Sequence, residues 1–421
     1  MQLVEHHIIK KTDARYKILD EVCFKSKNLY NAALYEIRQH FFDTKQFLNW
    51  LSVDKLFKEK KQDDYYSLPC KVSQQTLKLL NQNFKSFFSL LKKKNYTKKK
   101  SIPKYLDKVK GRFVAVYTNQ AISKKALRSG IIQLSGTDFK IRTKVDGNYI
   151  NQVRIVPKNS YYKVEVVYEV EEIEELEDNG RYAAIDLGVN NLATVSFNTS
   201  KPFIINGKPL KSINQFYNKR KAELSSILQK GEDSKHSEKH SKKLNAISAK
   251  RDRFFRDYFY KISHGILRYA VENDIDTIVV GKNQEWKQNI NNGKKNNQAF
   301  VSIPFAKFTF TFKLLCAKYG IQYIETEESY TSKASFLDGD EIPTYGGSDE
   351  KHTFSGRRVS RGIYKSSDGT KLNADINGAS NIIRKTIPTA FNKIADITFV
   401  TSATVWNFDK FYLKRKCIPL G

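Results

Sequence analysis

An aspartate at the end of an apolar run is the feature that most constrains how this chain folds. Residues 182–197 read YAAIDLGVNNLATVSF, in which small and β-branched residues lead to Asp186, and Gly188 separates them from a second apolar stretch. Two such runs around a glycine turn predict a β-hairpin. Asp186 would then lie at the tip of a buried strand, where a carboxylate is costly unless a cation neutralises it. A metal ion is one such cation.

The net charge indicates what a metal site in this chain would act on. The 421 residues include 73 Lys and Arg against 44 Asp and Glu, a formal net charge of +29. A surface of this sign attracts polyanions, and nucleic acid is the expected partner. A basic membrane-surface protein is the alternative, but the sequence has no apolar run of about 18 residues, and its start, MQLVEHHIIKK, does not read as a signal peptide. We therefore expect a soluble, cytoplasmic protein.

The cysteines exclude two further classes of protein. Cys23, Cys70, Cys316 and Cys417 have no paired spacing, which argues against a disulfide framework and against a thiolate zinc site. With 40% hydrophobic and 13% aromatic residues, a chain of this length can fill the cores of about two to three domains.

The first half of the chain is predicted to be a small β-barrel or sheet interrupted by helices. A short strand over residues 3–9 precedes a helix with apolar positions from Ile18 to Ile37, and strands return in QVRIVPKNSYYKVEVVYEVEE, where apolar and charged residues alternate. Between them, LPCKVSQQTLKLLNQNFKSFFSLLKKK predicts a second long helix. Its polar face carries Gln75, Lys78, Gln82, Lys85 and Lys92, which either pair with phosphates and base edges or are simply solvated.

The second half alternates strands and helices, so we predict an α/β fold there and α+β overall. It follows the acidic run EVEEIEELEDNG, which we interpret as a domain boundary. A helical hairpin over residues 215–271, with a disordered tip, precedes the buried strand DIDTIVVG, a helix over residues 305–319 and the strand IQYIETEE. In a final helix from Asp375, the spacing to Ala379 and Ile382 turns Asp375 toward the sheet.

Asp186 and Asp375 are thus two acids expected to face the same site. Hydrolysis of a phosphodiester by two divalent ions needs about three converging carboxylates. Hard oxygen ligands suit Mg²⁺ or Mn²⁺. Asp375 alone would serve equally well as a helix N-cap, but the two acids together on a basic α/β chain favour a nuclease site.

Three segments of the second half carry a family resemblance. They are AIDLGVNNLATVS, EESYTSKASFLDGDEIP and KHTFSGRRVSRGIYKSSDGTKLNADINGASNIIRK, within residues 180–390. They resemble the RuvC nuclease domain of the TnpB (OrfB) proteins of insertion sequences, relatives of the type V CRISPR effectors. The resemblance implies an RNase H-like fold and RNA-guided cleavage of double-stranded DNA. The oligomeric state stays open, and a monomer on one guide RNA is the simplest case. Asp186 and Asp375 match the first and last catalytic acids of that family.

The resemblance also implies a domain plan. Residues 1–12 and 100–175 would form a wedge-like β-barrel, residues 13–99 an inserted helical recognition bundle, residues 176–390 the RuvC domain and residues 391–421 a tail. The guide RNA would come from the transcript of the element, and in a prokaryotic host the protein would be associated with the nucleoid.

One departure from the family pattern moves a catalytic residue. The family usually carries a glutamate at the end of the fourth strand, where TIVVGKN places Gly281. Some branches, and the eukaryotic relatives called Fanzors, take the glutamate from the next strand, three residues before a Thr-Ser pair. That residue is Glu328 here, with Glu327 as the alternative. Adjacent strands lie about 4.8 Å apart, so a carboxylate on the next strand can reach the same metals. The competing interpretation is an inactive site with Glu328 as an ordinary surface acid.

The second departure concerns a zinc ribbon that the family normally inserts between its last two acids. Residues 333–372 contain no cysteine, and His352 alone cannot hold a tetrahedral zinc ion. We therefore expect no structural zinc. Packing of Phe336, Tyr345, Phe354 and Tyr364, or bound nucleic acid, would hold this segment instead.

Side chains in three segments are predicted to contact nucleic acid. The start of the second long helix would read a short DNA motif, the Lys- and Asn-rich loop after Gly281 would meet a displaced strand, and the arginines of residues 357–361 would meet phosphates. The residues are Ser73, Gln74, Lys78, Lys282, Trp286, Lys287, Arg357, Arg358 and Arg361.

Three functions remain open from the sequence. An RNA-guided, magnesium-dependent DNA endonuclease is supported by the acids and the charge. A guide-dependent DNA-binding repressor without cleavage is supported by Gly281. A strand-joining transposase is disfavoured, because we find no His-x-His arrangement, and with 23 tyrosines no single one stands out as a nucleophile.

Overall fold

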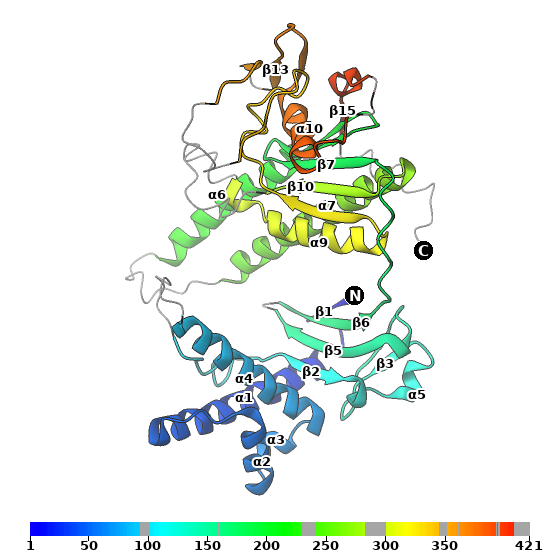
Figure 1. Ribbon diagram of the computed structural model, residues 1–421. Coiled ribbons are helices and arrows are strands. Elements are labelled where there is room, and N and C mark those ends of the chain that lie inside the picture. The colour runs from blue at the N-terminus through cyan, green and yellow to red at the C-terminus, as the bar shows by residue number, and fades with distance from the viewer. Residues whose placement is uncertain are drawn as a thin grey trace. The chain divides into compact units, whose positions relative to one another are not determined.

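The computed structural model describes residues 1–92, 101–158, 160–229, 241–282, 300–344, 352–360, 362–392, 394 and 396–407 (Figure 1). The chain divides into two compact units, Met1–Glu171 and Glu172–Gly421. Each unit has its own hydrophobic core. No helix in the described part of the chain is both long enough and apolar enough to cross a membrane.

The first unit combines a four-stranded antiparallel sheet with a group of helices. The sheet has the order β1 (Gln2–Lys10), β6 (Tyr161–Glu169), β5 (Ile150–Pro157), β2 (Ala115–Thr118). No ladder joins β1 to β2 among the residues described, so the predicted barrel is not confirmed. Beside the sheet lie a short helix and a two-stranded ribbon: α5 (Lys124–Leu127), β3 (Ile131–Gln133) and β4 (Lys140–Arg142).

The helices of the first unit are inserted between β1 and β2. They are α1 (Tyr16–Thr44), α2 (Trp50–Glu59), α3 (Asp63–Tyr66) and α4 (Cys70–Lys92). The two long helices were predicted, and Leu77, Leu80 and Phe84 of α4 are buried as their spacing requires. The short helices were not predicted, although Asn49 caps α2 by accepting hydrogen bonds from the backbone of Leu51 and Ser52.

The second unit is built on a six-stranded mixed sheet. Its order is β11 (Gln322–Thr326), β10 (Thr277–Gly281), β7 (Tyr182–Leu187), β8 (Asn191–Phe197), β9 (Phe203–Asn206), β15 (Thr404–Trp406). β7, β8 and β9 are antiparallel, whereas β10 is parallel to both of its neighbours. The predicted hairpin and the predicted central parallel strand are thus confirmed. β15 was not predicted; it extends the sheet beside β9, and Trp406 stacks on Phe203 with ring centroids 3.8 Å apart.

The two faces of this sheet carry different helices (Figure 1). Ala183, Ile185 and Leu187 of β7 pack into the core that contains α7 (Lys242–Glu272) and α9 (Phe305–Lys318). Ala184 packs with residues of α10 (Ala374–Thr386) on the opposite face. Because side chains alternate along a strand, Asp186 lies on the α10 face with Ala184.

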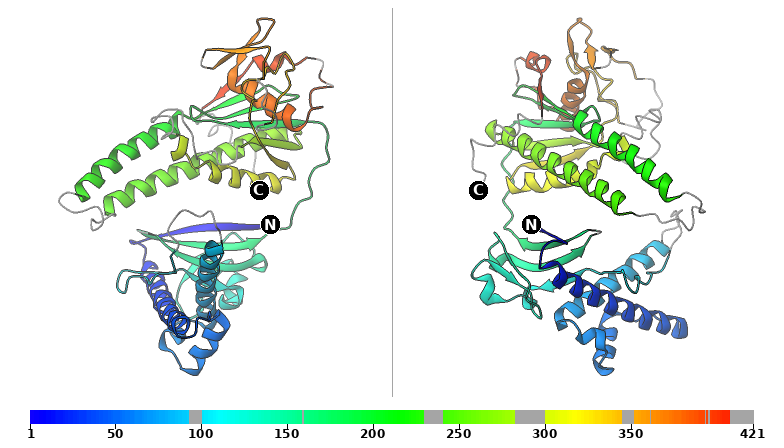
Figure 2. Two further views of the ribbon diagram at one scale, coloured as in Figure 1. Left: turned by 60° about the vertical axis from the view of Figure 1, so that its left-hand side comes forward. Right: turned by 180° about the vertical axis from the view of Figure 1, so that it is seen from behind.

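The predicted helical hairpin consists of α6 (Lys208–Leu228) and α7, which run side by side in both views of Figure 2. The tip QKGEDSKHSEKHSKK, residues 229–243, was predicted to be disordered. Residues 230–240 lie outside the residues described, and Lys242 and Lys243 begin α7 instead.

The segment between β11 and α10, where a zinc ribbon was considered, forms a small antiparallel sheet. Its strands are β12 (Arg357–Ser360), β13 (Ile363–Lys365) and β14 (Lys371–Asn373). Phe336 and Tyr364 are buried, as predicted. Phe354 is half-buried beside Tyr330, and Tyr345 lies outside the residues described.

Aspartates also hold this segment together, which the sequence did not suggest. Asp340 accepts hydrogen bonds from the backbone of Ser335 and from the backbone and hydroxyl of Ser355. Asp338 accepts hydrogen bonds from the hydroxyl of Ser335 and from Ser367. These bonds tie together turns that are up to 29 residues apart in the sequence.

Candidate active site

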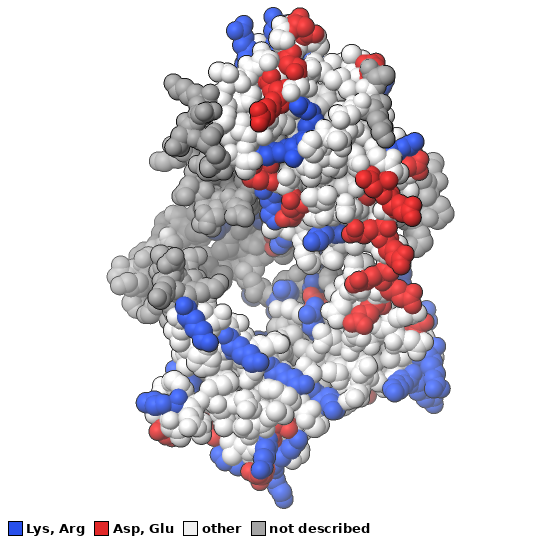
Figure 3. Space-filling model, viewed as in Figure 1, with Lys and Arg blue, Asp and Glu red and all other residues white. Residues whose placement is uncertain are grey.

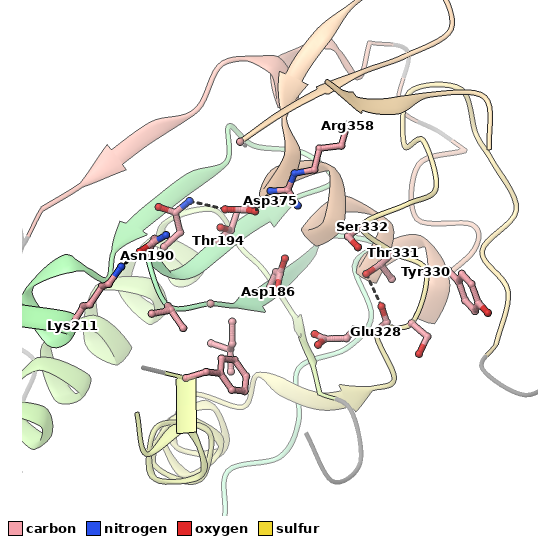
Figure 4. A pocket seen from close by; sticks show the side chains of 17 residues that line it. Asp186, Asn190, Thr194, Lys211, Glu328, Tyr330, Thr331, Ser332, Arg358 and Asp375 are labelled. Atoms are coloured by element: carbon pink, nitrogen blue, oxygen red, sulfur yellow. Dashed lines mark hydrogen bonds and ion pairs between the residues drawn. The ribbon is translucent and has the colours of Figure 1, made fainter. Parts of the chain in front are cut away.

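The three predicted catalytic acids line one pocket of the second unit (Figure 4). The pocket has a volume of about 920 Å³, and Asp186, Glu328 and Asp375 come to it from β7, from the turn after β11 and from the first turn of α10. The structure therefore brings together residues that are far apart in the sequence.

Asp186 lies deepest among the three acids. Burial raises its pKa well above the ordinary value, and the negative charges of Glu328 and Asp375 raise it further. Gly378 of α10 permits the close packing here, since a Cβ atom at that position would lie 3.1 Å from Oδ2 of Asp186. A helix with a larger residue at this point would have to move away from the aspartate.

Asp375 is not the N-cap of α10, contrary to one of the two interpretations of the sequence. The cap is Asn373, whose Oδ1 accepts hydrogen bonds from the backbone nitrogens of Asp375 and Ile376. The carboxylate of Asp375 is free of that role and faces the pocket with 31% of its side chain exposed, so it is less buried than predicted. It accepts a hydrogen bond of 2.6 Å from Nδ2 of Asn191, and a guanidinium nitrogen of Arg358 lies 3.7 Å from its other oxygen.

Glu328 reaches the pocket from beyond the end of a strand. β11 ends at Thr326, two residues earlier than the sequence predicted, and the chain then turns, with the hydroxyl of Thr331 donating to the carbonyl of Glu328. Oε2 of Glu328 is buried. Burial raises the pKa of Glu328 to about 7, and the charge of Glu327 adds to the shift while Lys385 opposes it.

Glu327 has a different environment from its neighbour. Its Oε2 forms an ion pair of 2.5 Å with Nζ of Lys385, and its Oε1 accepts a hydrogen bond from the backbone of Ser329. Lys385 is largely buried and also donates to the carbonyls of Ser329 and Pro343. Burial alone would raise the pKa of Glu327, but these hydrogen bonds lower it. Its carboxylate is thus engaged in holding the turn to α10.

Two polar contacts of the pocket were missed in the sequence. Asn191 binds Asp375 across 184 positions of sequence, and Nζ of Lys211 in α6 donates to Oδ1 of Asn190. The only sequence signal for these two contacts was the Asn-Asn pair in the predicted hairpin turn. Asparagine is common in turns because its side chain can hydrogen-bond to the nearby backbone, so the pair did not indicate a role in the pocket.

The predicted nucleic-acid contacts of the second unit are partly described. Arg358 lines the pocket, and Arg357 is exposed on β12. Lys282 is exposed and forms an ion pair of 2.7 Å with Glu325. The remaining three, Trp286, Lys287 and Arg361, lie outside the residues described.

In the first unit, the predicted contacts differ in accessibility. Ser73 is fully buried, and its hydroxyl donates to the carbonyl of Tyr65, so this side chain is not presented at the surface. Gln74 and Lys78 are half-buried, and Nζ of Lys78 lies 4.5 Å from the ring centroid of Trp50.

The donor set of the pocket fits a magnesium ion in its chemistry. Three carboxylates supply hard oxygen ligands. Burial, and after it the repulsion from Glu328 and Asp375, raises the pKa of Asp186, and a divalent cation would relieve both effects. Within the described ranges, no group of three or more His, Cys, Asp or Glu side chains is close enough to enclose an ion as it stands. The acids therefore share a pocket without forming a closed coordination shell.

Comparisons with known proteins bear on the family resemblance. Residues 165–287 match a family model described as a probable transposase (OrfB_IS605), and residues 305–382 match a Cas12f1-like TNB domain. The TnpB-like protein ORF457 of Acidianus two-tailed virus is 25% identical over 218 residues, which cover 51% of this chain and 44% of the relative. The chain thus spans less than half the length of this curated relative.

A solved structure shares the fold. The cryo-EM structure of a Cas12f1–sgRNA–target DNA complex aligns with a TM-score of 0.51 and 16% identity, over 87% of this chain and 82% of the other. At this low level of sequence identity, the similarity shows a shared fold and nothing more. The family models, the relative and the three sequence segments agree, and the chain is similar to the TnpB proteins and, in its fold, to a type V CRISPR effector.

Proposed function

We propose that the chain is an RNA-guided DNA endonuclease of transposon origin that hydrolyses phosphodiester bonds with Mg²⁺ at the pocket of Asp186, Glu328 and Asp375. The observation that carries this proposal is the meeting of three carboxylates, from three separate elements, in one pocket of a chain with a net charge of +29. The family supports it, as does a structural neighbour determined with guide RNA and target DNA.

The residues of the pocket have separate roles in this proposal. Asp186, Glu328 and Asp375 bind the metal, and the hydrogen bond from Asn191 fixes the orientation of Asp375. Bound divalent ions would activate water and stabilise the leaving oxygen. Arg358, which is 48% exposed at the rim, would contact a phosphate of the substrate once the metal neutralises Asp375.

The two units have separate roles as well. We assign the second unit to a RuvC-like nuclease domain with an RNase H-like fold, and the first unit to a wedge and recognition module. The acidic site must be paired with surfaces that hold the nucleic acid, because sequence recognition by an RNA-guided enzyme depends on base pairing rather than on the catalytic acids.

The clearest such surface is a row of lysines on α4, which we call the α4 lysine row: Lys71, Lys78, Lys85 and Lys92. Its members are seven residues apart, so they follow one line along the helix at intervals of about 10 Å. α4 contains no Asp or Glu, and Figure 3 shows basic side chains following this helix. We assign the row to phosphate contacts, with Lys78 half-buried and the other three exposed.

A nuclease-inactive, guide-dependent repressor is the second candidate. It is favoured by the open arrangement of the acids and by Arg358, whose guanidinium lies within ion-pair distance of Asp375. One cleavage assay distinguishes the endonuclease from the repressor. The full chain, purified with its co-expressed RNA, is incubated with a plasmid library in Mg²⁺ and then in EDTA.

The expected result is cleavage in Mg²⁺ that stops in EDTA and in Asp186→Ala. Asp274→Asn serves as the matched control, because Asp274 is an exposed acid of the same unit, ion-paired with Arg181 away from the pocket. Binding without cleavage by the wild type would instead establish the repressor.

A further inference from the structure

The first unit contains a pocket of its own, which the proposed chemistry does not use. It has a volume of about 350 Å³, within the range of pockets that hold small ligands. Five of the residues that line it lie on one face of α1, as their spacing by three and four positions requires, and the sixth belongs to the segment before β2. They are Tyr16, Lys17, Asp20, Glu21, Phe24 and Arg112.

Arg112 gives this pocket a rigid, planar wall. Its Nε and Nη2 donate to the two carboxylate oxygens of Asp20 over 3.0 and 2.8 Å, and its Nη1 donates to the carbonyls of Val109 and Gly111 over 3.1 and 2.7 Å. These four hydrogen bonds fix the plane of the guanidinium. Its central carbon lies 4.8 Å from the ring centroid of Phe24, so two planar groups are neighbours in the wall.

The charges around the pocket are nearly balanced. Asp20 is paired with Arg112, and Glu21 forms an ion pair of 2.6 Å with Lys25. Among the residues described, no carboxylate lies within ion-pair distance of Lys17, which is exposed. A cationic occupant would compete with Arg112, and an anionic one would meet two carboxylates. The pocket therefore suits a neutral, planar group.

Nucleobases are neutral and planar, and the chain attracts the polymers that carry them. Its net charge of +29 draws polynucleotides to the surface. Two exposed lysines, Lys11 and Lys110, are placed for the phosphates on either side of a bound base. Lys110 adjoins Gly111, and Lys11 is close enough for its charge to add to the hydrogen bonds from Arg112 that lower the pKa of Asp20.

The polar groups at the pocket select among the bases. Both oxygens of Asp20 are taken by Arg112, so Glu21 is the acceptor that remains and Lys17 is the donor. Guanine presents two donors, N1–H and its amino group, beside the acceptor O6, and a carboxylate with an ammonium group completes this pattern. Adenine and cytosine would instead point a ring-nitrogen lone pair at Glu21, and uracil would offer it only one donor.

We propose that this pocket binds an unpaired guanine of the bound RNA, with the base against Phe24 and Arg112 and its edge between Glu21 and Lys17. RNA is favoured over duplex DNA because its loops and bulges leave bases unpaired, and such bases are recognised by stacking on aromatic rings and guanidinium planes. The proposal rests on the proposed function in one point, that the chain carries an RNA, and it does not require cleavage.

The first test locates the guanine in the full chain purified with its co-expressed RNA. A glyoxal reagent that modifies N1 and N2 of unpaired guanines is applied to the complex and to the free RNA, and primer extension reads the modified positions. We expect one guanine that is protected in the wild-type complex and about fivefold or more reactive in the complex of Glu21→Ala, because its hydrogen-bond acceptor is removed.

Glu59→Ala is the matched control for this variant. Glu59 is an exposed acid of the same unit, and it too is paired with a lysine one helical turn away, Lys55. This control should leave every protected guanine protected. If no guanine depends on Glu21, or if Glu59→Ala exposes the same guanine, the proposal is wrong.

The second test measures base preference. Two RNAs that differ only in guanine or adenine at the protected position are co-expressed with the full chain, and sequencing of the bound fraction gives their ratio. The wild type should favour the guanine RNA by about fivefold or more, and Glu21→Ala should bind the two about equally. An equal preference in both chains would mean that the guanine is recognised elsewhere.

Two further measurements separate this proposal from its competitors. If calorimetry shows that guanosine monophosphate binds the wild type and not Glu21→Ala, while no guanine of the RNA is protected, the occupant is a free nucleotide and the proposal is wrong. If a Glu21-dependent guanine is found but the complex never cuts guided DNA, the pocket is correct and the nuclease function is wrong. If the complex cuts and no guanine depends on Glu21, the reverse holds.

Discussion

The pocket of the second unit and the α4 lysine row of the first unit are both concentrations of one kind of charge. Elsewhere on the long helices, opposite charges are paired one turn apart, as in Lys25–Glu21 of α1 and Lys261–Asp257 of α7. Among the residues described, no ion pair joins a lysine of the α4 row to an acid. The pocket instead concentrates three acids, and the charges of two of them add to the rise that burial causes in the pKa of Asp186.

The two regions differ in shape as well as in sign. The acids meet in one pocket, which suits a compact cation. The lysines follow about 30 Å of helix, which suits an extended polyanion such as a nucleic-acid backbone. From this comparison we infer that the pocket controls the chemical step, and the row controls affinity.

The largest expected effect is on the chemical step. Asp186→Ala, Glu328→Gln and Asp375→Asn should each lower guided cleavage by about three or more orders of magnitude, because each would remove a carboxylate that we propose as a metal ligand. Guided DNA binding, measured by filter retention, should be unchanged, since it depends on base pairing and phosphate contacts elsewhere. Loss of binding together with cleavage would contradict the division between the two regions.

The next effect is on affinity. Lys71→Gln, Lys85→Gln and Lys92→Gln, made together, should weaken RNA and DNA binding and lower the slope of log affinity against log salt by about 2–3. Cleavage of bound DNA at saturating protein should proceed at the rate of the wild type. Lys78 is left intact because it packs over Trp50.

A matched variant distinguishes the row from general basic charge. Lys124→Gln, Lys125→Gln and Lys144→Gln remove the same charge from exposed positions around α5 and β4 of the same unit. This control should change the salt slope by less than half as much. If both variants change it equally, the α4 lysine row is an ordinary part of the basic surface.

Much of the pocket could be predicted because its signals are local. The hairpin of β7 and β8 follows from two apolar runs and a glycine, and the α10 face of Asp186 follows from strand alternation. Glu328 was different: only the family resemblance singled it out. Its proximity to Gly281, where a Cβ atom would lie 2.7 Å from Oε2 of Glu328, is a contact between residues 47 positions apart in sequence.

The partners of the acids could not be predicted for the same physical reason. Asn191 and Asp375, or Glu327 and Lys385, meet only because the sheet and α10 pack together. Nor does periodicity show that Ser73 is turned into the core of its unit while Lys78 is not, since both lie on a helix with a broad buried face. Such features depend on tertiary contacts, which leave no pattern along the chain.

A smaller effect on cleavage is expected from substituting Glu327. This substitution distinguishes an acid that holds the turn after β11 from the acids proposed to bind metal. Glu327→Gln leaves the largely buried Lys385 without its ion-pair partner, so it should destabilise the protein by about 1–3 kcal/mol. At a temperature well below unfolding, cleavage should stay within about threefold of the wild type. If Glu327→Gln abolishes cleavage and Glu328→Gln does not, Glu327 is the metal ligand instead.

The smallest effect is a dependence of stability on pH in the chelated protein. Folding raises the pKa of Glu328 from 4.5 to about 7 and raises that of Asp186 as well, so the folded state binds these protons more tightly than the unfolded chain. The free energy of unfolding should therefore fall as pH rises from about 4.5 to about 7, the range over which the contribution of Glu328 is lost. Glu328→Gln should flatten this slope, and saturating Mg²⁺ should flatten or reverse it, because a bound cation favours the ionised carboxylates. Chemical denaturation in EDTA at several pH values measures the slope. A slope that is the same in Glu328→Gln as in the wild type would mean that burial does not raise the pKa of Glu328 in the folded protein.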